Sequence, residues 1–122
     1  MSFEIRTIAN FDRQAKRLAK HYESFRDDFK TLLEELQKKP MAGTDLGGGT
    51  RKVRMTIASK GKGKSGGARV ITYTADIIIH SCEGKLLLLS IYDKSEQSTI
   101  SDKEIKRLKK LAEEHNGLSE DD

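Results

Sequence analysis

The sequence predicts an α+β fold, in which helices pack on one face of a mainly antiparallel β-sheet. Three observations support this fold class. Two neighbouring segments near the N-terminus carry apolar residues at helical spacing, later segments alternate or run together as strands do, and a strong helix-start signal comes near the C-terminus. The predicted order is β-α-α-β-β-β-α. A chain of 122 residues fits one domain, which we place at residues 1–118, followed by a frayed acidic tail at 119–122.

The N-terminal third is expected to form one strand and two helices. Apolar and polar side chains nearly alternate from Phe3 to Ile8, which predicts a short strand. We expect Asn10 to cap the first helix, which runs to about Tyr22. A second helix begins near Ser24 and ends at Lys38-Lys39-Pro40, because proline cannot continue a helix. So short a link between two amphipathic helices predicts a helical hairpin.

The middle of the chain is rich in glycine, since eight of the ten glycines fall between Gly43 and Gly67. Two loops are predicted there, at Leu46–Thr50 and at Ser59–Gly67. The residues between these loops alternate, which predicts a strand with one buried face and one cationic face. The buried positions are Val53, Met55 and Ile57, and the opposite positions are Lys52, Arg54 and Thr56.

Two more strands and a helix complete the prediction. A β-branched stretch runs from Ala68 to about Ile79, a turn follows at Ser81–Gly84, and Leu86–Tyr92 is apolar enough for a central strand. Ser101 and Glu104 form an S-x-x-E capping box at the start of the last helix, and Gly117 is its expected stop.

The positive charge of the chain is concentrated in one segment. The formal net charge is +4, yet no Asp or Glu occurs between Leu46 and Ala75. Clustered cations suit a polyanion, because they release counterions from a phosphate backbone. The alternative is a solvated basic loop without a ligand. The cations of this segment are Arg51, Lys52, Arg54, Lys60, Lys62, Lys64 and Arg69.

Several classes of site and location are not expected. No run approaches the roughly 18 apolar residues of a membrane span, and Cys82 has no second cysteine to pair with, so we expect a cytoplasmic protein that makes no membrane contact. The three histidines lack metal-ligand spacing, and we expect neither a metal nor a cofactor. Gly63-Lys64-Ser65 ends like a phosphate loop, but a strand follows where such a loop needs a helix.

Three segments carry a resemblance to a known family. They are Gly48–Met55, Gly63–Ile71 and Leu88–Glu96, of which Gly-Gly-Ala-Arg-Val-Ile and Ile-Tyr-Asp-Lys-Ser-Glu are the most specific parts. The chain resembles the RelE/ParE toxin superfamily, and most closely its HigB/RelE-type branch. The resemblance implies a RelE-like fold and a toxin that a partner antitoxin holds inactive. It also implies a ribosome-dependent endoribonuclease, which enters the ribosomal A site and cuts mRNA by attack of the 2′-hydroxyl.

The resemblance also implies roles for individual residues. Lys52 matches the strand lysine that accepts the 2′-hydroxyl proton, and Arg54 matches its cationic neighbour. Arg69 matches the arginine that stabilises charge on the cleaved phosphate, and Lys94 stands near the place of a further basic residue. Some members use a tyrosine late in the chain as general acid, but no aromatic residue follows Tyr92, which is therefore the candidate acid. The expected RNA-binding cations are Arg51, Lys60, Lys62 and Lys64.

Two other functions fit the same sequence. One is a ParE-like inhibitor of DNA gyrase without catalytic activity, and the other is an RNA-binding domain that does not cleave. The Gly-Gly-Ala-Arg pattern and the basic middle favour RNA cleavage. The superfamily shares one fold across its activities, so the fold alone does not decide between them.

Overall fold

The computed structural model describes residues 4–61, 66–74 and 84–115. Its order of elements contains the predicted β-α-α-β-β-β-α series with one additional strand and a single 3₁₀ turn. The elements are β1 (Glu4–Thr7), α1 (Ala9–His21), α2 (Phe25–Lys38), β2 (Thr44–Gly47), β3 (Thr50–Met55), η1 (Ala58–Lys60), β4 (Ala68–Tyr73), β5 (Lys85–Asp93) and α3 (Asp102–His115).

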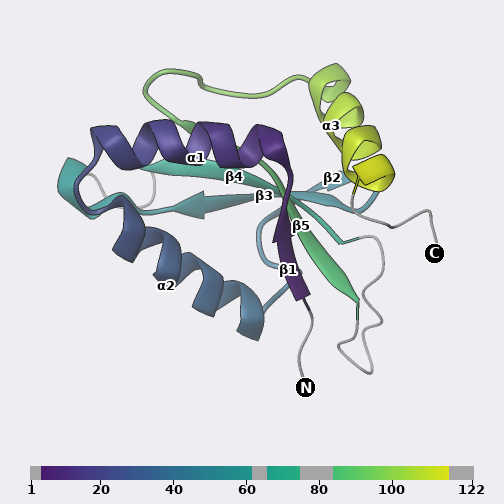
Figure 1. Cartoon of the computed structure of the whole chain (residues 1–122), viewed down its shortest axis with the longest axis horizontal. Coiled ribbons are helices and arrows are strands. Elements are labelled where there is room, and N and C mark those ends of the chain that lie inside the picture. Colours follow the sequence, from purple (N-terminus) through teal and green to yellow (C-terminus); the bar gives the residue numbers. More distant parts are fainter. Residues whose placement is uncertain (1–3, 62–65, 75–83, 116–122) are drawn as a thin grey trace.

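The strands form one five-stranded sheet in the order β1-β5-β4-β3-β2 (Figure 1). Among the strands that the structure describes, β1 and β5 pair in parallel and the other three pairs are antiparallel. The expectation of a mainly antiparallel sheet is therefore confirmed. β5 lies between β1 and β4, and every residue from Leu86 to Asp93 is buried. Burial on both faces explains why this strand is almost continuously apolar.

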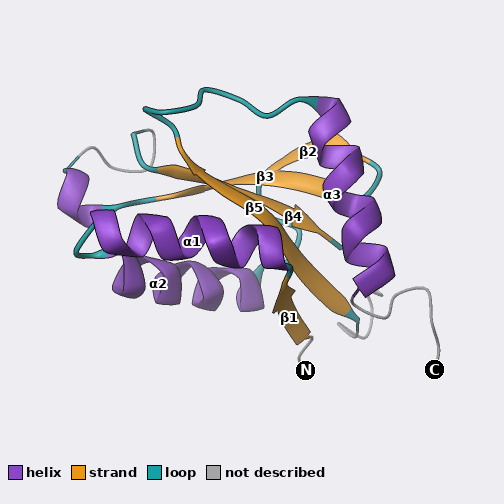
Figure 2. Cartoon of the chain, turned by 45° about the horizontal axis from the view of Figure 1, so that its top comes forward, coloured by secondary structure: helices purple, strands orange, loops and turns teal. Residues whose placement is uncertain are grey.

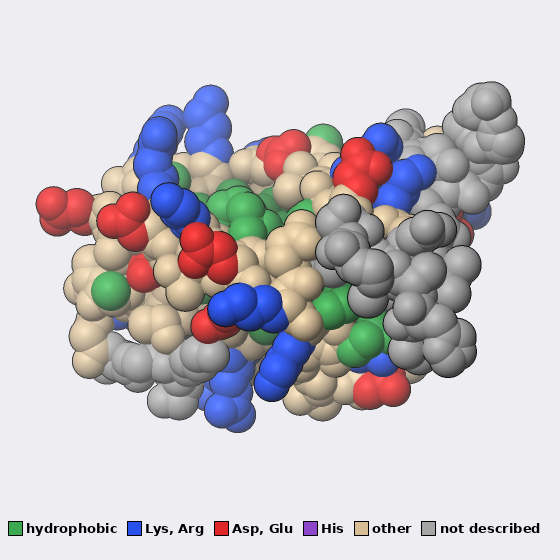
Figure 3. All heavy atoms as spheres, turned by 90° about the horizontal axis from the view of Figure 1, so that it is seen from below, with side chains coloured by type: hydrophobic (Ala, Val, Ile, Leu, Met, Phe, Trp, Pro, Cys, Tyr) green, Lys and Arg blue, Asp and Glu red, His purple; other side chains and the backbone are tan. Residues whose placement is uncertain are grey.

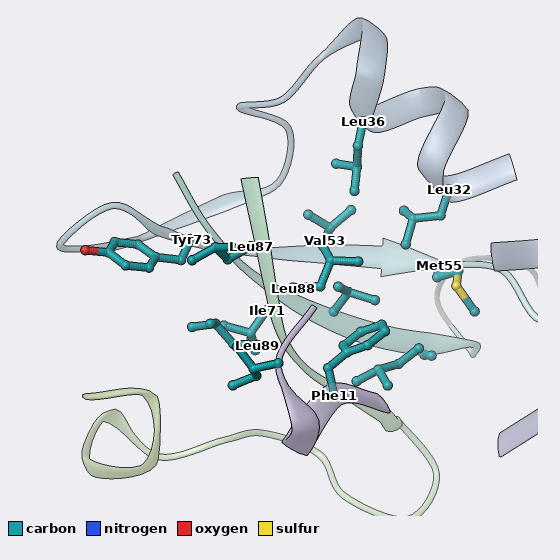
Figure 4. Packing of buried hydrophobic residues seen from close by; sticks show 14 of the residues in the cluster. Phe11, Leu32, Leu36, Val53, Met55, Ile71, Tyr73, Leu87, Leu88 and Leu89 are labelled. Atoms are coloured by element: carbon teal, nitrogen blue, oxygen red, sulfur yellow. The ribbon is translucent and has the colours of Figure 1, made fainter. Parts of the chain in front are cut away.

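The helices are divided between two regions of the sheet. α1 and α2 lie next to one another, whereas α3 stands apart, near β2 (Figures 1 and 2). Leu32 and Leu36 of α2 point toward β3, where Val53 and Met55 are buried (Figure 4). The face of β3 that carries Val53 and Met55 is thus the face covered by α2, as the alternating pattern predicts.

The predicted cap of the first helix is wrong. The helix begins at Ala9, and Ile8 occupies the N-cap position without a side-chain cap hydrogen bond. Asn10 lies inside the first turn, and its amide donates to the backbone oxygen of Leu89 at 3.0 Å. A partner on β5 has therefore replaced the local cap.

The predicted loop at Leu46–Thr50 is also wrong, because it contains parts of two paired strands. β2 pairs with β3 in antiparallel fashion, and the turn between them uses left-handed glycines, Gly48 (φ 61°) and Gly49 (φ 85°). A short edge strand that ends in glycine has little β-propensity of its own, so local sequence did not reveal it.

The second and third helices begin close to where the sequence indicated. α2 follows Ser24 and ends at Lys38, just before proline. The hydroxyl of Ser101 accepts a hydrogen bond from the backbone N–H of Glu104 at 3.1 Å, which is one half of the predicted capping box. β4 ends at Tyr73, and the rest of the expected strand, most of the Ser81–Gly84 turn, Gly117 and the acidic tail lie outside the described residues.

Candidate functional site

Three strands place side chains of different chemistry in one row. In the register of the sheet, Arg54 of β3 lies opposite Arg69 of β4, and Arg69 lies opposite Tyr92 of β5. Directly opposite residues of antiparallel strands project to the same face of a sheet. Arg54, Arg69 and Tyr92 therefore form a single row, called the Arg–Arg–Tyr row below.

The row lies on the face of the sheet that α2 does not cover. Val53 and Met55 point toward α2, and side chains alternate along a strand, so Lys52 and Arg54 project from the opposite face. Lys52 lies opposite Ile71, beside the Arg54–Arg69 pair. The sheet thus brings Lys52 together with the row, as the sequence pattern of β3 indicated.

Burial increases along the row. Arg54 is exposed, whereas Arg69 is 5% and Tyr92 is 3% exposed. The guanidinium of Arg69 donates to the backbone oxygen of Ala68 at 3.2 Å. A buried arginine beside an exposed one suits a phosphate, since planar guanidinium groups bind phosphate oxygens with two parallel hydrogen bonds.

The hydroxyl of Tyr92 is buried and has no hydrogen-bond partner within the described residues. Burial raises the pKa of this phenol, and the positive charge of Arg69 opposes that rise only in part. The hydroxyl therefore keeps its proton at neutral pH and is able to donate it or a hydrogen bond.

Two other predicted residues lie apart from the row. Arg51 follows the alternation of β3 to the opposite face, and its guanidinium donates to the hydroxyl of Thr74 at 3.2 Å. Lys94 is exposed directly after β5, and its backbone N–H donates to the oxygen of Gly67 at 3.0 Å. This bond places Lys94 beside the start of β4. Lys62 and Lys64 lie outside the described residues.

Lys60 is engaged in a buried ion pair rather than standing in solvent. Its ammonium lies 2.6 Å from a carboxylate oxygen of Asp93, and the two side chains are 8% and 0% exposed. The geometry therefore does not present Lys60 to RNA in the way expected of a loop cation, and it does not join the row.

Asp93 is the functional candidate that the sequence reasoning missed. Burial alone would raise the pKa of its carboxyl, but hydrogen bonds from Lys60, Tyr22 and Ser95 outweigh burial and hold this pKa well below its usual value. The hydrogen bond to Asp93 in turn raises the pKa of Tyr22 to about 12. The signal in the sequence was an acidic residue directly after the mostly apolar stretch Leu86–Tyr92.

The far end of the same sheet face is covered by α3. Thr50 lies opposite Tyr73 in the register, on the face of the row. The hydroxyl of Tyr73 donates to the carboxylate of Glu113 at 2.5 Å, and the ammonium of Lys109 lies 5.1 Å from the centre of its ring. A cavity of about 290 Å³ separates α3 from the β2–β3 turn. The row and α3 thus occupy opposite ends of one face.

Figure 3 shows the side chains of the molecule from below. Acidic and basic side chains are mixed there, with hydrophobic side chains visible between them. No cluster of His, Cys, Asp and Glu that could hold a metal ion occurs among the residues that the structure describes. No described helix has both the length and the apolar character needed to cross a membrane.

A family model described as the RelE toxin of the RelE / RelB toxin–antitoxin system matches residues 6–122. The chain belongs to the RelE toxin family. It is therefore the toxin of a toxin–antitoxin system, and the family implies a cognate antitoxin as its partner. The family resemblance inferred from the three sequence segments is confirmed. The fold agrees with it, because the described residues form the predicted three helices and a mainly antiparallel sheet.

Within this RelE toxin, the sheet brings together four of the five residues expected to act in catalysis. Lys52, Arg54, Arg69 and Tyr92 share one face, and Lys94 lies exposed at the end of the strand that carries Tyr92. The expected RNA-binding cations do not gather in the same way. Arg51 lies on the other face of β3, and Lys60 is paired with Asp93.

Proposed function

We propose that this RelE toxin is a ribosome-dependent endoribonuclease, which cleaves mRNA through attack of a 2′-hydroxyl on the adjacent phosphate. The observation that carries the proposal is the Arg–Arg–Tyr row with Lys52 beside it on one sheet face. Toxins of the RelE family are generally endoribonucleases, which supports the same activity. Since the ribosome and mRNA are its targets, the proposal places the toxin in the cytoplasm.

Each residue of the site takes the role that the family resemblance implies for it. Lys52 accepts the proton of the 2′-hydroxyl, and the resulting oxygen attacks the neighbouring phosphorus. Arg54 and Arg69 stabilise the negative charge that grows on the phosphate oxygens. Tyr92 donates a proton to the departing 5′-oxygen, so that the products are a 2′,3′-cyclic phosphate and a free 5′-hydroxyl.

Binding of the RNA backbone is assigned to cations outside the reacting centre. Lys94 is exposed next to the start of β4, where it can contact a neighbouring phosphate. Lys62 and Lys64 belong to the acid-free segment and remain candidates from the sequence. We leave Arg51 and Lys60 out of this role, because one lies on the opposite face and the other forms the ion pair with Asp93.

The proposal is tested by inducing the toxin in growing cells and mapping the 5′ ends of cellular RNA, with DNA supercoiling measured in parallel. We expect new 5′ ends inside translated messages and normal supercoiling. Arg69→Ala should abolish the new ends, while Arg51→Ala, on the other face of the sheet, should retain them. Relaxed DNA with intact messages would instead show a gyrase inhibitor. If neither effect is observed, the remaining function is that of an RNA-binding protein that does not cleave.

A further inference from the structure

The end of β5 carries a buried carboxylate directly behind the candidate site. Asp93 follows Tyr92 in the chain and lies opposite Ala68, which precedes Arg69. Because neighbouring residues of a strand project to opposite faces, Asp93 occupies the reverse side of the sheet at the same strand ends as the Arg69–Tyr92 pair. A displacement of Asp93 would therefore move both partners of that pair.

Asp93 joins three separate parts of the chain. Its carboxylate accepts hydrogen bonds from the hydroxyl of Tyr22, which caps α1, and from the ammonium of Lys60 in η1 at 2.6 Å. It also accepts bonds from the backbone N–H of Ser95 at 2.9 Å and from the hydroxyl of Ser95 at 2.7 Å. The ammonium of Lys60 and both groups of Ser95 reach Oδ1, and the hydroxyl of Tyr22 reaches Oδ2, so both carboxylate oxygens are engaged.

The glycine-rich connection between β3 and β4 is held at both ends by this part of β5. On one side Lys60 is bound to Asp93, and on the other side Gly67 accepts a hydrogen bond from the backbone N–H of Lys94. Gly67 also packs closely on β3, since a Cβ atom there would lie 2.1 Å from the backbone oxygen of Met55. The entry into the strand that carries Arg69 is thereby fixed.

A buried ion pair adds little net stability to a fold. Removing two charges from water costs about as much as their attraction returns, and apolar replacements are often equally stable. In some proteins a buried polar or ionic group instead fixes one geometry, because a buried charge is tolerated only where its partner is in place. The Lys60–Asp93 pair lies directly behind the row, so a fixed geometry of the pair would also fix the strand ends that carry Arg69 and Tyr92.

We propose that Asp93 is a positioning residue, whose buried ion pair with Lys60 holds Arg69 and Tyr92 in register for phosphate cleavage. The inference rests on the proposed endoribonuclease function. It assigns to Lys60 a role in the architecture of the site in place of direct RNA binding. Because Asp93 and Lys60 act through the strands, they do not touch the RNA.

The test compares kcat and KM for cleavage of mRNA on ribosomes by purified toxin variants. Asp93→Asn should lower kcat by a factor of about 10², as expected for misplaced catalytic groups, and should leave KM unchanged. The control is Glu96→Gln in the same loop, which breaks the exposed ion pair with Arg17 and should leave kcat unchanged. A folded Asp93→Asn protein with the kcat of the wild type would overturn the inference.

A double variant separates positioning from stability. Lys60→Met combined with Asp93→Asn leaves no buried charge alone, so its melting temperature should recover relative to Asp93→Asn. Its kcat should stay low if the pair positions the site. Recovery of kcat together with stability would show a purely structural pair, and this variant decides the question if Asp93→Asn does not fold.

A direct readout keeps the inference distinct from the proposed function. The side-chain NMR signals of Arg69 and Tyr92 should shift in the double variant and stay in place in Glu96→Gln. If the wild-type toxin cleaves no mRNA, the proposed function fails, yet shifted signals would still support positioning of this pair. Unchanged signals in the double variant would refute it.

Discussion

Arg54 lies directly opposite Arg69 in the register of β3 and β4, so two arginine side chains project from neighbouring positions on one face of the sheet. Facing like charges destabilise an antiparallel pair, by roughly 0.2–1 kcal/mol. A phosphate bound between the two groups would convert this repulsion into attraction. The pair is therefore costly for the free toxin and favourable for the complex with RNA, and the effects of substitution on stability and on binding should have opposite signs.

Arg54→Gln should separate these two effects. Loss of one exposed cation should stabilise the free toxin by a few tenths of a kcal/mol, because like charges no longer stand opposite each other in the two strands. The same change should weaken binding to single-stranded RNA and reduce the slope of log affinity against log salt by about 0.7, the value for one phosphate contact. Denaturant unfolding and a salt titration of RNA binding measure the two quantities.

Arg51→Gln is the matched control, because Arg51 stands on the same strand but projects from the opposite face. Its salt slope should equal that of the wild type. An equal loss of slope in both variants would mean that RNA follows the general positive charge of β3 and does not select the face of the row.

Arg69→Ala should reduce the cleavage rate by about 10²–10³-fold, the effect of removing one donor to a developing negative charge. Arg69→Lys should also be impaired, since an ammonium cannot make the two parallel hydrogen bonds of a guanidinium. Single-turnover cleavage on programmed ribosomes measures the rate, and circular dichroism checks the fold. An alanine variant with wild-type cleavage would remove Arg69 from the site.

The buried carboxylate of Asp93 predicts a dependence of stability on acid. Its folded-state pKa lies below the ordinary value, so the hydrogen bonds of the ionised form stabilise the toxin above that ordinary value of roughly pH 4. This stabilisation is lost as the pH falls toward the folded-state pKa. Asp93→Asn should reduce stability at pH 7 by about 3–5 kcal/mol and flatten the acid limb of the stability curve. An acid limb identical to that of the wild type would contradict this assignment.

Tyr22 predicts a complementary effect in alkali. The hydrogen bond to Asp93 raises its pKa from 10 to about 12, so the protonated phenol stabilises the folded state fully below pH 10. Between pH 10 and 12 this contribution is lost, because the unfolded chain releases the proton first. Tyr22→Phe should lower stability at pH 7 by about 1.5–3 kcal/mol. Between pH 10 and 12 the stability of this variant should fall less steeply than that of the wild type. Thermal unfolding of the wild type and of Tyr22→Phe across this range measures the difference.

The elements of the fold followed from short-range patterns. These patterns involve residues that are close in the chain. They are the apolar spacing of α1 and α2, the alternation of β3 and the nearly continuous apolar run of β5. The errors came where a distant partner decided the outcome. The side chain of Asn10 binds the backbone of β5 and does not cap the helix. β2 forms because it pairs with β3.

Only part of the candidate site could be predicted from the sequence. Alternation put Lys52 and Arg54 on one face of β3, but the alignment of Arg54, Arg69 and Tyr92 depends on the register between strands. Lys60 looked like a loop cation among glycines, because its partner Asp93 lies 33 residues away in the chain. Burial of that pair is a tertiary property, and the local charge pattern carries no sign of it.

The last prediction concerns the cognate antitoxin. The row of cations and the helix α3 occupy opposite ends of one sheet face, so a single partner could engage either or both. An acidic segment would be attracted to the row, and we expect fast, salt-sensitive association. An apolar partner helix would instead compete for the contacts of Ile105 and Leu108, which are buried residues of α3.

Hydrogen exchange of the purified toxin–antitoxin complex distinguishes these arrangements. If the antitoxin masks the site, amides of β3 and β4 should gain protection, and the Arg54→Gln variant should associate more slowly at low salt. If the antitoxin displaces α3, the amides of residues 102–115 should change instead, while Arg54→Gln associates at the wild-type rate. Both changes together would show one partner spanning the whole face. Protection confined to α1 and α2, which cover the other face, would refute masking and indicate inhibition at a distance from the row.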